Sequence, residues 1–239
     1  MEEREAKMTY CVESEIAAFE KGEGLDLTAT PNPEDVDAAW CLRFLRAIRD
    51  VAFATVGTDG LPSVRIIDVM AVTGARLYFL APRGKAFHDD VMRERFVAIV
   101  GQTPDYRTCR IRGRVVHPEG EAAQHALVDA IFDLNPSMNL LYSGKNRCIC
   151  DVFYVEEGGG EYFDLGQNPV YRKPFRIGGK LDARGTFLVT DACIECGTCA
   201  AVCPEQCIAL GSPYDIDQSH CLRCGICQEA CPVQVIVKR

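Results

Sequence analysis

Nine of the fourteen cysteines in this 239-residue chain lie between residues 193 and 231, and their spacing restricts what that segment can form. The pattern C-x2-C-x2-C-x3-C-P occurs there twice, offset by 28 residues. The first copy contains Cys193, Cys196, Cys199 and Cys203, and the second contains Cys221, Cys224, Cys227 and Cys231. Three thiolates spaced in this way on a tight loop can reach three corners of one cubane cluster, so the fourth ligand must come from elsewhere. Zinc sites favour paired C-x2-C knuckles or cysteine–histidine sets, which argues against zinc here.

Two runs in register, each followed by proline, resemble the bacterial ferredoxins that carry two 4Fe–4S clusters. In those proteins the fourth cysteine of each run binds the other cluster. The resemblance implies one cluster on Cys193, Cys196, Cys199 and Cys231, and a second on Cys221, Cys224, Cys227 and Cys203. Cys207 aligns with Val235 in the repeat, and we expect it to be a small buried hydrophobe. Such a domain moves single electrons and has no substrate pocket of its own.

Charge and hydropathy exclude several other classes of protein. The net charge of −8 is opposite in sign to that of a typical nucleic-acid binder. No uncharged apolar run has the length of a membrane-spanning helix, and the acidic N-terminus lacks the apolar stretch of a secretory signal. We therefore expect a cytoplasmic protein without nucleic-acid or membrane partners. The air sensitivity of such clusters favours an anaerobic or microaerobic cell.

The rest of the chain has the pattern of a mainly β domain. We expect an N-terminal helical segment at 1–36, a barrel domain at 37–178 and the two-cluster domain at 179–239, joined at Gly178-Gly179. An acidic first turn at Glu34-Asp35 predicts a helix to about Asp50. Short apolar runs predict strands at 51–56, 64–72, 77–80, 96–100 and 109–116, helices at 86–95 and 119–133, and a hairpin of 149–155 and 161–165 around three glycines. This order favours an α+β, mainly β chain built on an antiparallel barrel.

The order of several short motifs resembles the FMN-binding split barrel of the pyridoxamine 5′-phosphate oxidase-like superfamily, over roughly residues 38–178. The motifs are VAFATV at 51–56, Asp59-Gly60-Leu61-Pro62, VRIIDV at 64–69, LYFLA at 77–81, Arg83-Gly84-Lys85 and IRGRV at 111–115. The resemblance implies an antiparallel split barrel and a homodimer with each FMN held between two subunits. The C-terminal substrate-binding segment of the oxidase is absent, so pyridoxamine phosphate is not an expected substrate and the catalytic residues are unknown.

The same resemblance implies a set of FMN contacts. It implies contacts from Arg65, from the backbone of Ile66, Ile67 and Val69, from the main chain of Phe79, Leu80 and Ala81, from Arg83 and Lys85 to the phosphate, and from Gln102. The phosphate contacts also have a physical basis, because a helix N-terminus offers free N–H groups and a positive dipole end. Arginine adds a bidentate fork and lysine a point charge.

Ordinary structural roles remain open for these and other side chains. Arg65, Arg83 and Lys85 could be solvated surface charges, and Arg110, Arg112 and Arg114 predict an exposed basic strand face. His88, His117, His125 and His220 show no partner pattern. Cys148 and Cys150 could form a redox pair, although buried or idle thiols are the commoner outcome, and Tyr142 could cover a flavin or simply pack.

Three functions fit this sequence. The first is an FMN-dependent oxidoreductase that receives electrons from an external ferredoxin or reductase through two 4Fe–4S clusters and passes them to a small-molecule acceptor. The second is an electron-transfer or redox-sensing adaptor without a substrate of its own. The third is a split barrel that binds haem or a deazaflavin in place of FMN, although the predicted strands offer no obvious axial histidine for haem.

Overall fold

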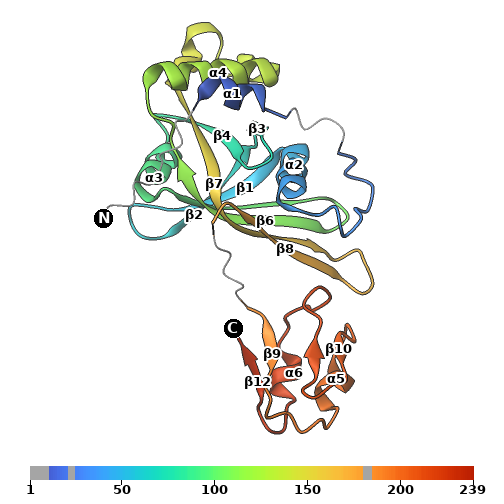
Figure 1. The fold of residues 1–239 in the computed structure, drawn as a ribbon. Coiled ribbons are helices and arrows are strands. Elements are labelled where there is room, and N and C mark those ends of the chain that lie inside the picture. Colours follow the sequence, from blue (N-terminus) through green and yellow to red (C-terminus); the bar gives the residue numbers. More distant parts are fainter. Residues whose placement is uncertain (1–10, 21–24, 180–184) are drawn as a thin grey trace, which may run out of the picture.

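The computed structural model describes residues 11–20, 25–179 and 185–239, and its largest part is a curled antiparallel sheet (Figure 1). The strands follow the order β2-β1-β5-β6-β7-β4-β3, with β8 paired to β7. They are β1 Asp50–Val56, β2 Pro62–Asp68, β3 Ala71–Val72, β4 Leu77–Pro82, β5 Phe96–Gln102, β6 Arg107–Val116, β7 Cys150–Asp164 and β8 Tyr171–Ile177. Each pairing in this sheet is antiparallel, so the predicted antiparallel split barrel is confirmed.

The predicted hairpin at 149–165 is wrong, because β7 runs unbroken through Gly158 and Gly160. A Cβ on Gly158 would lie 2.2 Å from the carbonyl oxygen of Arg112, and one on Gly160 would lie 2.3 Å from the ring of Phe175. These glycines therefore allow close approach of neighbouring strands rather than a turn. The strand that pairs with this part of β7 is β8, which is not among the strands predicted from the sequence.

Two further element boundaries differ from the prediction. The run at 64–72 is two strands, β2 and β3, which lie at opposite ends of the strand order. The chain leaves β2 at Val69, whose N–H donates to the carbonyl oxygen of Arg49. Helix α2 (Ala38–Ile48) begins at Ala38 rather than at Glu34, because the Asp37 carboxylate accepts a hydrogen bond from the Trp40 N–H at 2.7 Å.

The other helices of the barrel part lie around the sheet (Figure 1). They are α1 Val12–Ala17, α3 Ala86–Glu94, α4 Glu121–Leu134, and the 3-10 helices η1 Pro136–Leu140 and η2 Gly144–Ile149. Of the predicted N-terminal helical segment, residues 1–10 and 21–24 lie outside the described residues, including the glycines expected to end its helix. No described helix is long and apolar enough to cross a membrane.

The sheet has one buried face and one partly exposed face. α2 packs on the buried face with Phe44 and Leu45, against Phe53 and Tyr162. A second core lies beneath α4. On the opposite face of β2, β1 and β5, five large apolar side chains are 43–65% exposed, and we call them the apolar strip: Val56, Val64, Ile66, Phe96 and Val100. The register places these strands side by side, so the strip is one continuous surface.

Residues 185–239 form a smaller unit next to β8 (Figure 1). Its elements are β9 Phe187–Val189, α5 Thr198–Val202, β10 Ile208–Ala209, β11 Asp215–Ile216, α6 Ile226–Glu229 and β12 Ile236–Lys238. β9 pairs with β12 and β10 with β11, around a core of cysteines and apolar side chains. The predicted joint at Gly178-Gly179 follows directly after β8, and residues 180–184 lie outside the described residues. The domain boundaries remain a prediction.

Candidate cluster and cofactor sites

The eight motif cysteines line two separate hollows. The first hollow is lined by Cys193, Cys196, Cys199 and Cys231. The second is lined by Cys203, Cys221, Cys224 and Cys227. The fourth cysteine of each run thus lies beside the other run, as the resemblance to ferredoxins implies. Four thiols around a mostly apolar hollow match the donor set of a 4Fe–4S cluster, so the residues present fit that group.

The two cysteine loops repeat the same backbone geometry. In the first loop the N–H of Glu195 donates to Cys193 Sγ at 3.4 Å, and in the second the N–H of Arg223 donates to Cys221 Sγ at 3.3 Å. Glu195 and Arg223 both have left-handed backbone conformations, with φ of 59° and 56°. This conformation turns an N–H toward the thiolate, where it can stabilise a cluster's negative charge.

Cys207 also lines the second hollow, with its Sγ 3.6 Å from Cys203 Sγ. Its counterpart in the repeat, Val235, lines the first hollow. Cys207 is 8% exposed, in agreement with the expected small buried side chain. No two of the cysteines form a disulfide in the described structure.

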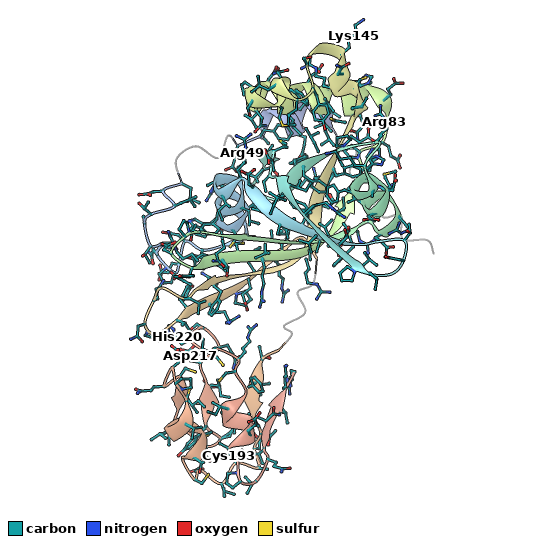
Figure 2. All side chains as sticks on the ribbon, turned by 180° about the vertical axis from the view of Figure 1, so that it is seen from behind. Arg49, Arg83, Lys145, Cys193, Asp217 and His220 are labelled. Atoms are coloured by element: carbon teal, nitrogen blue, oxygen red, sulfur yellow. The ribbon has the colours of Figure 1, made fainter. Side chains whose placement is uncertain are left out.

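The second hollow is the one that adjoins the barrel. Arg172 of β8 donates from its N–H to the carbonyl oxygen of Ser219 at 2.7 Å and from Nε to that of Cys221 at 3.2 Å. Figure 2 shows His220 at the junction with the barrel and Cys193 at the far end of the smaller unit. His220 Nδ1 lies 2.8 Å from the carbonyl oxygen of Val170, although the sequence showed no partner for this histidine.

Glu161 of β7 connects this junction by three ion pairs. Its carboxylate binds Arg172, Arg110 Nη2 at 2.7 Å and Arg223 Nη1 at 2.8 Å. Glu161 and Arg172 are both buried. Arg110, Arg112 and Arg114 are all exposed, as predicted for the basic face of β6, and Arg110 also pairs with Glu161.

The candidate phosphate residues lie at the start of α3. Lys85 is the residue before α3, and its side chain forms no capping hydrogen bond with the first turn of the helix. The Arg83 side chain is 51% exposed. Arg83 also binds Asp151 Oδ1 at 2.7 Å and the carbonyl oxygen of Cys148 at 2.6 Å. In Figure 2, Arg83 lies on the side of the barrel away from the smaller unit.

Two histidines that sequence reasoning set aside complete this cluster. His88 Nε2 lies 2.8 Å from Asp151 Oδ2, and His117 Nε2 lies 3.4 Å from the same oxygen. Arg83 follows β4, His88 lies in α3, His117 follows β6 and Asp151 lies in β7, so only the fold brings these residues together. Burial lowers the pKa of His117. Burial raises the pKa of Asp151, but the hydrogen bonds from His88 and Arg83 lower it by more.

The remaining predicted flavin contacts do not all share one surface. Arg65 turns toward α3, where it binds Thr55 Oγ1 at 2.7 Å and lies 3.5 Å from Asp90. Ile66 points the other way, into the apolar strip. The backbone groups of Val69 already bind Arg49 and Arg46, and Gln102 is exposed at the end of β5.

The main chain of β4 offers a partly open edge. β3 pairs only with Leu77 and Tyr78, and the Met70 N–H donates to the Tyr78 carbonyl oxygen on that edge. Alternate residues of a strand direct their backbone groups to the same edge, so Leu80 faces this way beyond the end of β3. Ile67, Phe79 and Ala81 pack in the core.

The Cys148 and Cys150 thiols are not a pair in this fold. Cys148 is exposed in η2 and Cys150 is buried at the start of β7. Burial raises the pKa of Cys150 to about 11, so its thiol is protonated at neutral pH and unreactive. Tyr142 packs against the core beneath α4.

Comparison with known proteins identifies the C-terminal unit. Residues 192–235 match a family described as a 4Fe-4S dicluster domain. The ferredoxin of Butyribacterium methylotrophicum is 49% identical over 33 residues, which is 14% of this chain and 60% of that protein. The C-terminal unit is thus a 4Fe–4S dicluster domain, and the chain spans about three fifths of the ferredoxin it matches.

Solved structures align with the barrel part. A NimC/NimA family protein from Clostridium acetobutylicum aligns with a TM-score of 0.49 and 20% identity, over 57% of this chain and 90% of that one. A pyridoxamine 5′-phosphate oxidase-related, FMN binding protein from Nostoc punctiforme has a TM-score of 0.46 and 14% identity, over 60% and 91%. A heme binding protein from Mycobacterium smegmatis has a TM-score of 0.45 and 15% identity, over 61% and 58%.

Proposed function

We propose that this protein is an FMN-dependent oxidoreductase that receives single electrons through its two clusters and reduces a small-molecule acceptor. The observation that carries the proposal is the contact between the two parts. A buried arginine of the barrel, Arg172, binds the backbone of the cysteine loop around the second hollow. A dicluster domain held in this way delivers electrons to one fixed place on the barrel, because covalent linkage and docking raise the effective concentration of the donor.

The flavin part of the proposal rests on the split-barrel motifs of the sequence and on two structural features, the start of α3 and the open edge of β4. The uncapped first turn of α3, with Arg83 and Lys85 before it, would hold the phosphate. The open edge of β4 at Leu80 would hydrogen-bond the polar edge of the ring system. An FMN bound there would collect single electrons and deliver them in pairs.

A second copy of the chain is part of this proposal. The apolar strip is a continuous exposed surface of a kind that marks an interaction site. The dicluster domain meets the same face of the sheet further along, at Glu161 and Arg172. A second copy on the strip would therefore bring its own barrel next to the cluster at the second hollow. Arg83 lies away from the dicluster domain of its own chain (Figure 2). In such a dimer, the dicluster domain of one copy would instead supply electrons to the barrel of the other copy.

The test is anaerobic purification of the full chain, cofactor extraction and rapid-mixing reduction. We expect extracted FMN, and we expect the cluster absorbance to bleach before the flavin bands when a low-potential one-electron donor is added. A double variant, Arg83→Gln with Lys85→Gln, should lose FMN while keeping both clusters. Lys145→Gln removes another exposed charge and should keep FMN.

Three results would contradict the proposal in different ways. A Soret band or a deazaflavin in the extract would replace FMN. A flavin that stays oxidised while the clusters are reduced would favour an adaptor without its own substrate. Retention of FMN by the double variant would move the phosphate site elsewhere.

A further inference from the structure

The two cysteine loops carry opposite charges at the same position of the repeat. Glu195 and Arg223 are 28 residues apart, share a left-handed backbone conformation and donate an N–H to the first cysteine of their own loop. The backbone environments of the two hollows are therefore alike. Their side-chain charges are not, and charge near a cluster is one of the factors that set its reduction potential.

The cysteine loop around the second hollow contains Arg223 and contacts Arg172, so buried positive charge lies next to this loop, whereas Glu205 lines the hollow itself. The Arg223 side chain is 17% exposed and that of Arg172 is 5% exposed, and a buried charge is screened far less than a surface one. Negative groups also lie here: Glu161 is shared by Arg110, Arg172 and Arg223, and Glu205 accepts a hydrogen bond from the Val170 N–H. Three guanidinium groups, of which that of Arg110 is 61% exposed, thus share Glu161, and Glu205 adds a second carboxylate nearby.

Arg223 also has a donor left over. Its Nε is buried and has no hydrogen-bond partner among the described residues. A buried N–H without a partner costs about 1–3 kcal/mol, so natural proteins seldom leave one. Arg223 lies between Cys221 and Cys224 in the loop around the second hollow, so an anionic cluster there would add negative charge near this guanidinium.

The first hollow lacks such groups. Its lining in the described structure is cysteines, apolar residues, Gly197 and Tyr214. The charged side chains next to it in the chain are Glu195 and Asp191, both exposed and both acidic. The Tyr214 hydroxyl donates to the carbonyl oxygen of Glu195 and adds no charge.

We propose that Arg172 and Arg223 give the cluster at Cys203, Cys221, Cys224 and Cys227 a higher reduction potential than the cluster at Cys193, Cys196, Cys199 and Cys231. The outer cluster takes one electron from an external low-potential donor. It is then oxidised as it passes that electron to the barrel-side cluster, which is reduced by one electron. Because Arg172 belongs to β8, the barrel itself raises the potential of the cluster docked on it, and electrons collect next to the barrel. This inference rests on the dicluster domain and its contact with β8, and it needs no flavin.

The experiment is a redox titration of the anaerobic full-length protein followed by electron paramagnetic resonance. The wild type should show two one-electron steps whose equilibrium constants differ at least tenfold, which is about 59 mV. Arg223→Gln and Arg172→Gln should each lower the reduction potential of the upper step, by an amount that corresponds to about a tenfold change in its equilibrium constant. The potential of the lower step should not change. Arg223→Lys keeps the charge and should keep most of the difference.

Two further variants separate charge from damage to the fold. Glu195→Arg changes an exposed side chain and should raise the reduction potential of the lower step alone. Arg176→Gln removes an exposed charge of the same strand as Arg172 and should move neither step. Iron content and the number of reducible clusters show whether each variant is intact. If an Arg172 or Arg223 variant does not assemble its clusters, the potentials of Glu195→Arg test the charge effect instead.

The inference is overturned if intact Arg172→Gln, Arg223→Gln and Glu195→Arg proteins titrate as the wild type does. It is also overturned if the two steps shift together in each variant. A protein without clusters would instead contradict the proposed function. If the variants hold clusters whose reduction potentials equal those of the wild type, the proposed function stands and only the effect of Arg172 and Arg223 on the potentials is excluded.

Discussion

Asp151 holds together the polar cluster beside α3. Its two carboxylate oxygens bind Arg83 and His88, and His117 lies 3.4 Å away. The side chain is nearly buried, so loss of one partner would leave polar groups unsatisfied. The cluster therefore orients Arg83 at the start of α3, where we place the phosphate.

The free energy of unfolding should depend on pH through His117. Its pKa in the folded chain is lowered by burial below the ordinary 6.5, so the unfolded chain takes up the proton first as the pH falls. Stability is fully present above about pH 6.5 and decreases below it, by up to about 1.4 kcal/mol per pH unit. Asp151, whose folded pKa is also lowered, adds a second loss below its ordinary 3.8.

Urea unfolding followed by the fluorescence of Trp40, the single tryptophan, measures this dependence for the barrel. His117→Gln should flatten the slope of stability against pH between about 6.5 and 5. His125→Gln, at an exposed position of α4, should not change the slope. An unchanged slope in His117→Gln would show that another group is responsible.

Cys207 offers a second test, because it lies beside the second hollow without a place in the motif. We expect Cys207→Val to keep both clusters, since Val235 takes the equivalent position at the first hollow. Cys203→Ala should lose the barrel-side cluster. Iron and acid-labile sulfide per chain, measured anaerobically, distinguish the two. Equal losses in both variants would make Cys207 a ligand.

β7 is the element that connects the sheet. It pairs with β6, β4 and β8, and its residue Glu161 reaches the dicluster domain. Its glycines let β6 and β8 approach it on both sides. Disturbing them should therefore affect both the barrel and the docking of the clusters.

Gly160→Ala should lower the free energy of unfolding by about 1–3 kcal/mol, because the new methyl group meets the Phe175 ring and the Arg110 carbonyl oxygen. Gly74→Ala is the matched control, since a Cβ there meets nothing within 4 Å. Urea unfolding of both variants measures the difference. A Gly160→Ala protein as stable as the control would mean that β7 and β8 separate at little cost.

Elements with strong local signals could be predicted from the sequence. The Asp59-Gly60 pair between β1 and β2 is an example, because the turn of an antiparallel hairpin depends on the backbone preferences of a few adjacent residues. The glycines of β7 could not be assigned in this way. Whether such a run turns or stays extended depends on Phe175 and Arg112, which the sheet brings near them.

The assembly can be tested through the apolar strip. We expect the wild type to be a dimer, and Val64→Asp with Ile66→Asp to be a monomer that has lost FMN, because both side chains are 65% exposed on the strip. Leu140→Asp, at an 89% exposed position outside the strip, is the control and should stay dimeric. Sedimentation velocity gives the state of each. A wild-type monomer that retains FMN would remove the second copy from the proposal.

The eight candidate cluster ligands could be predicted from the spacing of the cysteines, and their division between two clusters from the resemblance to ferredoxins, because a cubane requires cysteines at fixed spacings. The antiparallel barrel was predicted from the order of short strands and few helices along the chain. What depended on the folded chain was the meeting of Asp151 with two histidines, and of Arg172 with the Cys221 loop. Those contacts join strands and loops that are distant along the chain, and side chains without a fixed spacing leave no pattern by which such contacts could be foreseen.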